Sequence, residues 1–338
     1  MNNQNQGRQS AMPVKNFKFN LALLALSALT ACGGGSGDST TGAASTSQTQ
    51  PEKPAAQPTI VTSVPTPTYL AGGMSKAAYD LLNQERATCG FGLLAQNAKL
   101  DAAAAAHAEY LLANNTISHT QSPQLQKFTG VSPMDRAKAQ GYDAWYAGDD
   151  IAGNVPDGRS AIRGLLAAPY HSASMISAMR DVGISFLQTT TAQTFTSMDV
   201  ILLGVQSTAT NMQLPVREAV LTYPCQDSAG FKPAFSNEYP NWRAGSVDAG
   251  AGGHPVIITA PNGEALVITS ATISAVGGGV VPTQILTAAN DPNKVVGTHQ
   301  AFVIPPASLA PNTTYRVQIV GTVAGVQFAK DFTATTGS

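Results

Sequence analysis

The chain changes character near residue 215, and this change limits the folds that it can adopt. Upstream of that point, alanine-rich segments carry apolar residues at helical spacing. Downstream, the chain is rich in glycine, proline, valine and threonine, in short alternating runs typical of strands. The roughly 270 residues after residue 68 exceed one average domain in length. We therefore expect two folded parts, at residues 71–215 and 216–338.

Helices and strands alternate in the first part. The clearest helix is expected from about Asn97 to Asn115, where one buried stripe repeats at steps of four, three and four residues. That stripe consists of Leu100, Ala104, His107 and Leu111. Further helices are expected near residues 75–89, 132–141 and 160–166, and strands near 182–187 and 195–204. This order favours a sheet covered by helices, an α/β/α sandwich, in which His107 is a core residue.

The second part is expected to be all-β. Strands are predicted near residues 255–259, 265–274, 300–304, 314–320 and 326–333. Short strands at this spacing, separated by glycine, asparagine or proline, predict a β-sandwich. The segment 305–336, with Tyr315 in it, resembles the last hairpin of bacterial Ig-like and fibronectin-type modules. That resemblance implies a role in spacing or adhesion.

The N-terminus has the layout of an export signal. Lys15 and Lys18 precede an apolar run over residues 21–29, which is too short to span a membrane, and Leu-Thr-Ala-Cys ends the segment at Cys32. This resembles a bacterial lipoprotein signal with its lipobox. The resemblance implies a mature chain that begins at Cys32, carries covalent lipid such as palmitate there, and is anchored to a membrane. Gly33 points to the outer membrane of the cell envelope. The alternative is an ordinary secretory peptide with an incidental cysteine.

Residues 32–70 are expected to form a disordered tether. Glycine, serine, threonine, glutamine and proline dominate there, so the segment cannot bury enough apolar surface to fold. A flexible chain of about three dozen residues has a mean reach on the order of 30 to 35 Å. The folded part can therefore stand away from the bilayer.

Charge and cysteine usage fit an exported protein. Without Arg8, Lys15 and Lys18 of the signal, the mature chain has 16 basic and 20 acidic side chains, which argues against a nucleic-acid partner. Three cysteines occur in the chain, and lipid accounts for Cys32. The remaining two are Cys89 and Cys225. In an oxidising compartment they would form a disulfide, and the alternative is two buried free thiols.

Several short motifs occur in the order of a known domain. They are Leu82–Arg86, Leu100–Asn115, Ile117–His119, Ser132–Ala137, Gly148–Ala152, Pro169–His171 and Asp181–Ile184. Together they resemble a bacterial CAP domain, also called SCP, of the superfamily of cysteine-rich secretory proteins, antigen 5 and pathogenesis-related 1. The resemblance covers residues 75–207 and implies the same α/β/α sandwich.

The resemblance also implies a central cleft that can hold zinc or another divalent cation. The family motifs place His119, Asp149 and His171 as its ligands, with an open fourth position at which a water could be activated. Three departures weaken this expectation: Asp149 is shorter than the usual Glu, Ser172 replaces Arg, and Leu165 stands where Trp is common. A hydrogen-bonded structural role for the two histidines is the alternative.

Three functions remain open from the sequence. The first is a non-catalytic module that binds a lipid, sterol, peptide or glycan in the cleft. The second is a metal-dependent hydrolase of peptidase type, and the third is a structural protein of the envelope. No Gly-x-Ser-x-Gly elbow and no His-Glu-x-x-His motif occurs, so no catalytic residue is assigned. His254 and His299 are given no function.

Overall fold

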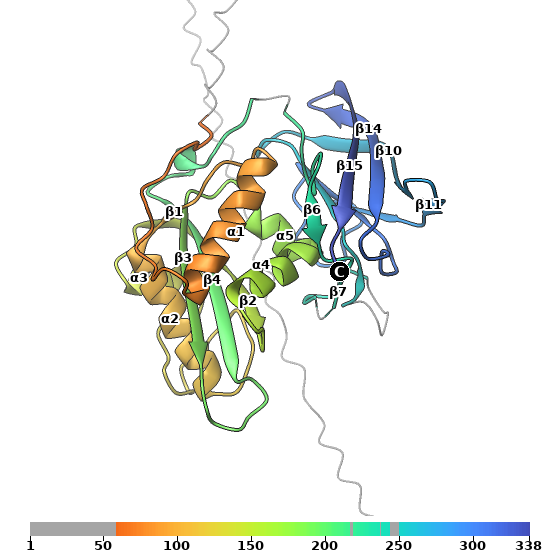
Figure 1. Ribbon diagram of the computed structural model, residues 1–338. Helices are drawn as coiled ribbons and strands as arrows, with labels where there is room; N and C mark the ends of the chain where they lie inside the picture. The colour runs from red at the N-terminus through yellow and green to blue at the C-terminus, as the bar shows by residue number, and fades with distance from the viewer. Residues whose placement is uncertain (1–58, 217–218, 237, 244–249) are drawn as a thin grey trace, which may run out of the picture. The chain divides into compact units, whose positions relative to one another are not determined.

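The computed structural model describes residues 59–216, 219–236, 238–243 and 250–338 (Figure 1). The chain divides into two compact units, residues 1–54 and 55–338, and all described residues belong to the second. The signal, Cys32 and residues 33–58 of the predicted tether therefore lie outside the described residues. In the part of the chain that is described, no helix has the length and apolar character needed to cross a membrane.

The first part of the fold is a four-stranded sheet flanked by helices, in the order β1-β3-β4-β2. Its strands are β1 (Ala95–Gln96), β2 (Ala144–Gly153), β3 (Asp181–Gln188) and β4 (Ser197–Gln206). Its helices are α1 (Met74–Thr88), α2 (Ala98–Ala113), α3 (Pro133–Ala139), α4 (Gly158–Ala167) and α5 (Pro169–Met175), and the short 3-10 helix η1 (Ala209–Asn211) follows β4. The predicted α/β region is confirmed.

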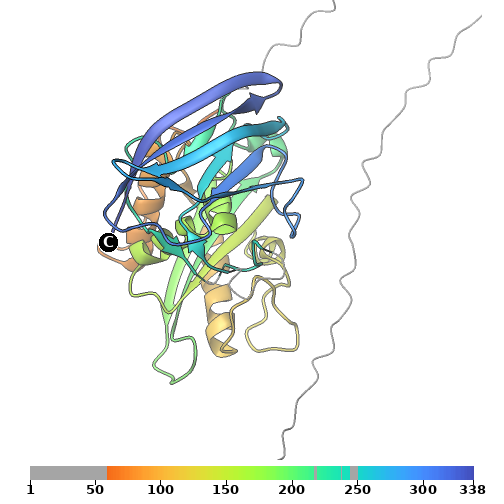
Figure 2. The same ribbon diagram turned by 90° about the vertical axis from the view of Figure 1, so that its right-hand side faces the viewer.

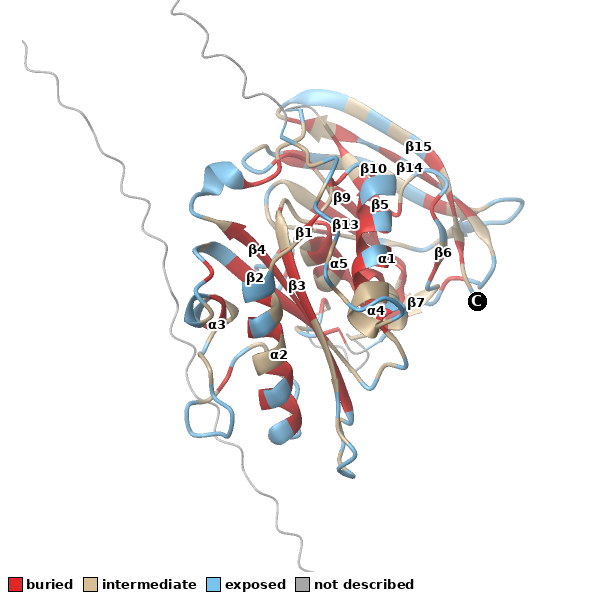
Figure 3. Ribbon diagram, turned by 60° about the vertical axis from the view of Figure 1, so that its left-hand side comes forward, coloured by how far each residue is buried: buried red, intermediate tan, exposed pale blue. Residues whose placement is uncertain are grey.

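The central strand β4 is buried on both faces. Val200 and Leu202 pack with α2, whereas Ile201 and Leu203 pack with α1, α4 and α5. Successive residues of a strand point to opposite faces, so a continuous apolar run is what a strand covered on both sides requires. Figure 3 shows this strand between the buried sides of the helices.

Local signals in the sequence fix where the helices begin. The Asn97 side chain caps α2 by accepting a hydrogen bond from the Lys99 amide at 3.0 Å. Ser132 and Asp135 form a capping box at the start of α3, and Pro133 occupies the first turn of that helix. Pro169 opens α5 directly after α4 ends, because a proline is tolerated only in the first turn of a helix.

The second part of the fold is mainly β, as predicted, and contains several sheets (Figures 1 and 2). One five-stranded sheet has the order β11-β10-β14-β15-β6, and a four-stranded sheet has the order β12-β13-β9-β5. The strands are β5 (Leu221–Tyr223), β6 (Ala229–Phe231), β9 (Val256–Thr259), β10 (Leu266–Ala275), β11 (Val280–Val281), β12 (Gln284–Thr287), β13 (Gln300–Ile304), β14 (Thr314–Val323) and β15 (Val326–Thr336). Strands β7 (Ala234–Phe235) and β8 (Gly252–Gly253) pair separately.

The four-stranded β12-β13-β9-β5 sheet is buried on both faces. Ala301 and Val303 of β13 pack with the five-stranded sheet. Phe302 and Ile304 of the same strand belong to the core that includes α1, α4 and α5. In addition, the Tyr170 hydroxyl of α5 donates a 2.6 Å hydrogen bond to Asp291. The two parts of the chain therefore share one hydrophobic core.

The folded part begins earlier than the predicted tether boundary at residue 70. The Thr59 amide donates to the Leu214 carbonyl at 2.8 Å, and the Leu93 amide donates to the Val61 carbonyl at 2.8 Å. These bonds place residues 59–61 against the CAP-like part. The polar composition of the segment did not indicate these contacts, several of which are made by backbone groups.

A disulfide joins the two parts, as predicted. Cys89 at the end of α1 is bonded to Cys225, 136 residues further along the chain, with Cα atoms 5.5 Å apart. The separation of the Cα atoms is ordinary for a disulfide. Because the bond closes a long loop, it removes much conformational entropy from the unfolded chain.

Replacing both cysteines, Cys89→Ser with Cys225→Ser, should lower the free energy of unfolding by up to about 4 to 5 kcal/mol, the loss of loop-closure entropy. Urea unfolding followed by circular dichroism measures this. Dithiothreitol should lower the stability of the unsubstituted chain by a similar amount and leave the double variant unchanged. Equal stability of the two proteins under oxidising conditions would contradict the prediction.

Strand β4 also holds a buried acid without a partner. Asp199 is fully buried, and neither of its carboxylate oxygens has a hydrogen-bond partner among the described residues. Burial, helped by the charge of Asp157, raises the pKa of Asp199 to about 8. The folded protein thus keeps this proton at a pH where the unfolded chain, with an ordinary carboxyl pKa of 3.8, releases it. Stability attributable to Asp199 is therefore complete below pH 4 and declines as the pH rises toward 8.

Asp199→Asn should remove that decline, because an amide does not ionise. We expect the variant to gain more than about 1 kcal/mol over the unsubstituted protein between pH 4 and pH 8. Urea unfolding at several pH values measures the gain. Asp143→Asn, at an exposed aspartate, is the matched control and should leave the pH dependence unchanged. Parallel stability curves for Asp199→Asn and the parent would refute the assignment.

Candidate binding cleft

The edge strand β2 supplies two adjacent carboxylates that point to opposite faces of the sheet. Asp149 faces α2 and α3, where it meets His119 and Arg136. Asp150 faces α5, where it accepts a 2.8 Å hydrogen bond from the Ser174 hydroxyl. Burial raises the pKa of Asp150 to about 6, so this carboxyl is mostly ionised at neutral pH.

Asp149 is the centre of a buried polar network. Its Oδ1 lies 2.8 Å from His119 Nδ1, and its Oδ2 accepts a 2.6 Å hydrogen bond from Arg136 Nη2. The side chains of Asp149 and Arg136 are 1% and 0% exposed. Both oxygens of Asp149 therefore accept hydrogen bonds, and although aspartate is shorter than the usual glutamate, its side chain still reaches both partners.

His107 lies behind this network and belongs to the core, as its place on the apolar stripe predicts. Its side chain is fully buried, with Nε2 3.0 Å from the Ser118 carbonyl and Nδ1 2.9 Å from Gln121 Nε2. Burial, aided by the charge of Arg136, lowers the pKa of His107 to about 4. A neutral ring that donates to Ser118 and accepts from Gln121 satisfies all of these contacts.

His119 stands at the surface of the cleft. Its side chain is 43% exposed, and its hydrogen bond to Asp149 raises its pKa despite partial burial. With Nδ1 bonded to the carboxylate, the Nε2 atom is the one left for a ligand.

His171 of α5 is held in the same way, by an acid from the second part of the chain. Its Nδ1 lies 3.1 Å from Oε1 of Glu238, whose side chain is fully buried. Burial alone would lower the pKa of His171, but the hydrogen bond and charge of Glu238 outweigh it and raise the pKa to about 9. His171 is thus an imidazolium at neutral pH.

The two histidines face each other across a hollow surface. Their ring centroids lie 6.1 Å apart. Two adjoining cavities, of about 620 and 390 Å³, are both lined by His119, His171 and Tyr239. Ile117 and Ile151 line the larger one, and Tyr146 lines the smaller one beside Asp149 and Asp150. Tyr146 and Tyr239 are 43% and 76% exposed, so aromatic rings are available to a ligand.

The residues that were predicted to bind a metal are brought to one cleft but not into one ligand cluster. His119 and Asp149 bond each other, whereas His171 pairs with Glu238. Among the described residues, no group of three or more histidine, cysteine, aspartate or glutamate side chains is arranged to hold a metal ion. The Nε2 atom of each histidine could ligate such an ion once it carries no proton, whereas each oxygen of Asp149 already takes part in a hydrogen bond. Asp149 as third ligand stays a prediction.

Two participants in the cleft were not assigned a role from the sequence. Arg136 lies in a motif that the family resemblance includes. Its place in the predicted helix did not indicate that its side chain would be buried and would pair with Asp149. Glu238 lies 67 residues beyond His171, in an irregular segment. The packing of the two parts brings it to the cleft, and the periodicity of the sequence does not report such packing.

Comparison with known proteins identifies the first part of the chain. Residues 79–200 match the sequence profile of the Cysteine-rich secretory protein family, CAP. This segment is a CAP domain, which confirms the family resemblance for that stretch. No curated protein matches the chain.

Two solved structures are similar to this chain. An outer surface protein from Borrelia burgdorferi is 22% identical, with 39% of this chain and 92% of that chain covered and a TM-score of 0.34. An extracellular protein containing an SCP domain from Bacillus anthracis is 22% identical, with 40% of this chain and 41% of that chain covered and a TM-score of 0.34.

Arg136→Met should cost about 3 kcal/mol or more of folding stability, because it leaves the Asp149 carboxylate buried without its cation. The double variant Arg136→Met with Asp149→Leu should lose less than the single variant, since no charge then remains unpaired. Urea unfolding at pH 7 measures both.

The matched control for this prediction is the exposed pair Arg316–Asp331, whose side chains are 53% and 47% exposed. Arg316→Met should change stability little, because solvent screens that pair. Equal losses from Arg136→Met and Arg316→Met would contradict the buried network.

Proposed function

We propose that this protein is a lipid-anchored protein of the bacterial cell envelope whose CAP cleft binds a ligand without catalysing a reaction. The observation that carries the proposal is the state of the cleft acid. Asp149 is buried and both of its oxygens are engaged by His119 and Arg136. Asp149 is the acid that the family resemblance offers as metal ligand or base, and its hydrogen bonds favour a positioning role for it instead.

Export to the envelope, with attachment to the outer membrane, is supported by two features. The lipobox that ends at Cys32 provides a lipidation site, and the disulfide between Cys89 and Cys225 is of the kind that persists in oxidising compartments. In this proposal, the lipid on Cys32 inserts into the bilayer of the outer membrane.

The second part of the chain is, in this proposal, an Ig-like β-sandwich that supports the cleft. Its five-stranded and four-stranded sheets share one core, which is the packing of a sandwich. It also supplies Glu238 and Tyr239 to the cleft. Beyond spacing or adhesion, this module therefore helps to build the binding surface.

The lining of the cleft suits an amphipathic ligand such as a lipid, a peptide or a glycan. Ile117 and Ile151 offer an apolar wall, whereas Tyr146 and Tyr239 offer exposed rings with hydroxyl groups. Aromatic side chains of this kind provide contact area at one end and hydrogen bonding at the other.

Metal-dependent hydrolysis is the second candidate, and one observation favours it. Both histidines bond a carboxylate through Nδ1, which is how ligating histidines are usually oriented. Zinc held by the two Nε2 atoms would supply a Lewis acid and an activated water.

Zinc calorimetry on the chain from residue 32 onward, with Cys32→Ser, separates the two candidates. We expect a dissociation constant no tighter than about 10 µM at pH 7, because two imidazoles are fewer than the usual ligand set. His119→Ala and His171→Ala should abolish that weak binding, and His299→Ala, outside the cleft, should not change it. Submicromolar zinc binding lost in both cleft variants, together with zinc-dependent cleavage of a peptide substrate, would overturn the non-catalytic proposal.

A further inference from the structure

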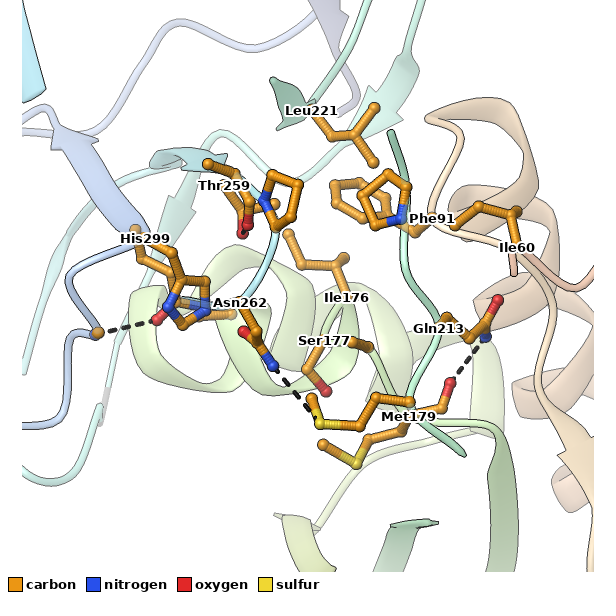
Figure 4. Close-up of a pocket in the computed structure, with 18 of the residues that line it drawn as sticks. Ile60, Phe91, Ile176, Ser177, Met179, Gln213, Leu221, Thr259, Asn262 and His299 are labelled. Atoms are coloured by element: carbon orange, nitrogen blue, oxygen red, sulfur yellow. Dashed lines mark hydrogen bonds between the residues drawn. The ribbon is translucent and has the colours of Figure 1, made fainter. Parts of the chain in front are cut away.

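A second cavity is lined by residues from both parts of the chain (Figure 4). Its volume is about 240 Å³, and it shares no lining residue with the cleft. His171 and Ser174 line the cleft, whereas Ala173 and Ile176 line this junction cavity. The two sites are thus built on one short helix and can be tested separately.

The floor of the junction cavity is apolar. Phe91, Ile176, Met179 and Met212 line it, and each is less than 10% exposed. Ile60 and Leu221 continue the wall on the side opposite Asn262 and His299 (Figure 4). Burying the apolar surface of a ligand here is favourable, at roughly 25 cal/mol per Å², and methionine side chains adapt their shape to the ligand.

Polar groups with spare hydrogen-bonding capacity border this floor. Among the described residues, the one hydrogen-bond contact of the Asn262 side chain is with the Met212 sulfur, at a long 3.6 Å. Among the described residues, neither the His299 ring nor the Ser177 hydroxyl has a hydrogen-bond partner. A few polar groups around an apolar floor are typical of small-molecule sites.

The cavity carries no formal charge. Acids, lysines and arginines are absent from its described lining, and its one titratable side chain is His299. Burial lowers the pKa of His299, which keeps the ring neutral at pH 7. An ionic ligand would lose its hydration without gaining a counter-charge, so the lining selects against ions.

We propose that the junction cavity binds a small uncharged molecule with an apolar body and a hydroxyl or carbonyl group. The apolar body contacts Met179 and Met212, and the polar group bonds to His299, beside Asn262 and Ser177. The volume of the cavity equals that of about eight water molecules at ~30 Å³ each, and this limits the size of the ligand. Entry is beside Asn262 and Val295, which are exposed.

Methionine-methyl NMR with 1-naphthol as the probe tests the proposal. The sample is the chain from residue 32 onward with Cys32→Ser, labelled with ¹³C at methionine methyl groups and assigned by Met→Leu substitutions. We expect 1-naphthol to shift the Met179 and Met212 signals saturably. Met198, fully buried in the core beside α2, is the internal control and should not move. Naphthalene-1-sulfonate has the same ring system with an anionic group, and it should produce no saturable shift.

Two pairs of variants complete the test. His299→Ala should weaken 1-naphthol binding about fivefold or more, the effect of losing one hydrogen bond, and His119→Ala in the cleft should not alter it. Ala178→Phe should fill the cavity and abolish the shifts, while Val280→Phe at an exposed position should not. Absence of a saturable shift in the parent, or equal binding of the sulfonate, would overturn the proposal whatever zinc does at the cleft.

Discussion

Burial of both faces of the β12-β13-β9-β5 sheet is the constraint on which the rest of the structure depends. Along β13, alternate side chains enter two different cores, with Val303 toward the five-stranded sheet and Phe302 toward the CAP domain. A sheet with two apolar faces cannot leave either one in water without losing the hydrophobic free energy of the whole face. The second part of the chain is therefore packed against the first part over a whole face of this sheet. Its fixed position delivers Glu238 to the cleft and closes the junction cavity.

The disulfide between Cys89 and Cys225 adds to the same junction. The disulfide lowers the conformational entropy of the unfolded chain by closing a loop, whereas the shared core stabilises the folded state by burying apolar side chains. Tyr170 and Asp291 connect the same two parts by a hydrogen bond within the buried region. Apolar packing, a covalent bond and a polar contact thus fix one arrangement of the two parts. Residues separated widely in sequence can then form a site whose geometry is fixed before a ligand arrives.

Much of the fold follows from local sequence, and the cleft follows only in part. Apolar spacing predicted α2, a serine followed by a proline predicted α3, and a short apolar run predicted β13 at its observed bounds. Strand β2 was not predicted, because its two glycines and two adjacent aspartates have low strand propensity. It forms because β4 offers it a hydrogen-bonding edge. Glu238 and the burial of Arg136 arise from tertiary packing, which periodicity does not report.

The cleft holds ionisable groups of both signs in equal number, and this bears on how it can select a ligand. Asp149, Asp150 and Glu238 contribute three carboxylates, and Arg136 with the two histidines His119 and His171 contributes three groups that can carry positive charge. A balanced cleft exerts little long-range attraction on either anions or cations. Selection must then act at short range, through the rings of Tyr146 and Tyr239 and the Nε2 atoms of the histidines, which bond to none of the described residues. A simple cation or anion would gain little from this arrangement, whereas an amphipathic ligand would contact both the tyrosine rings and the imidazoles.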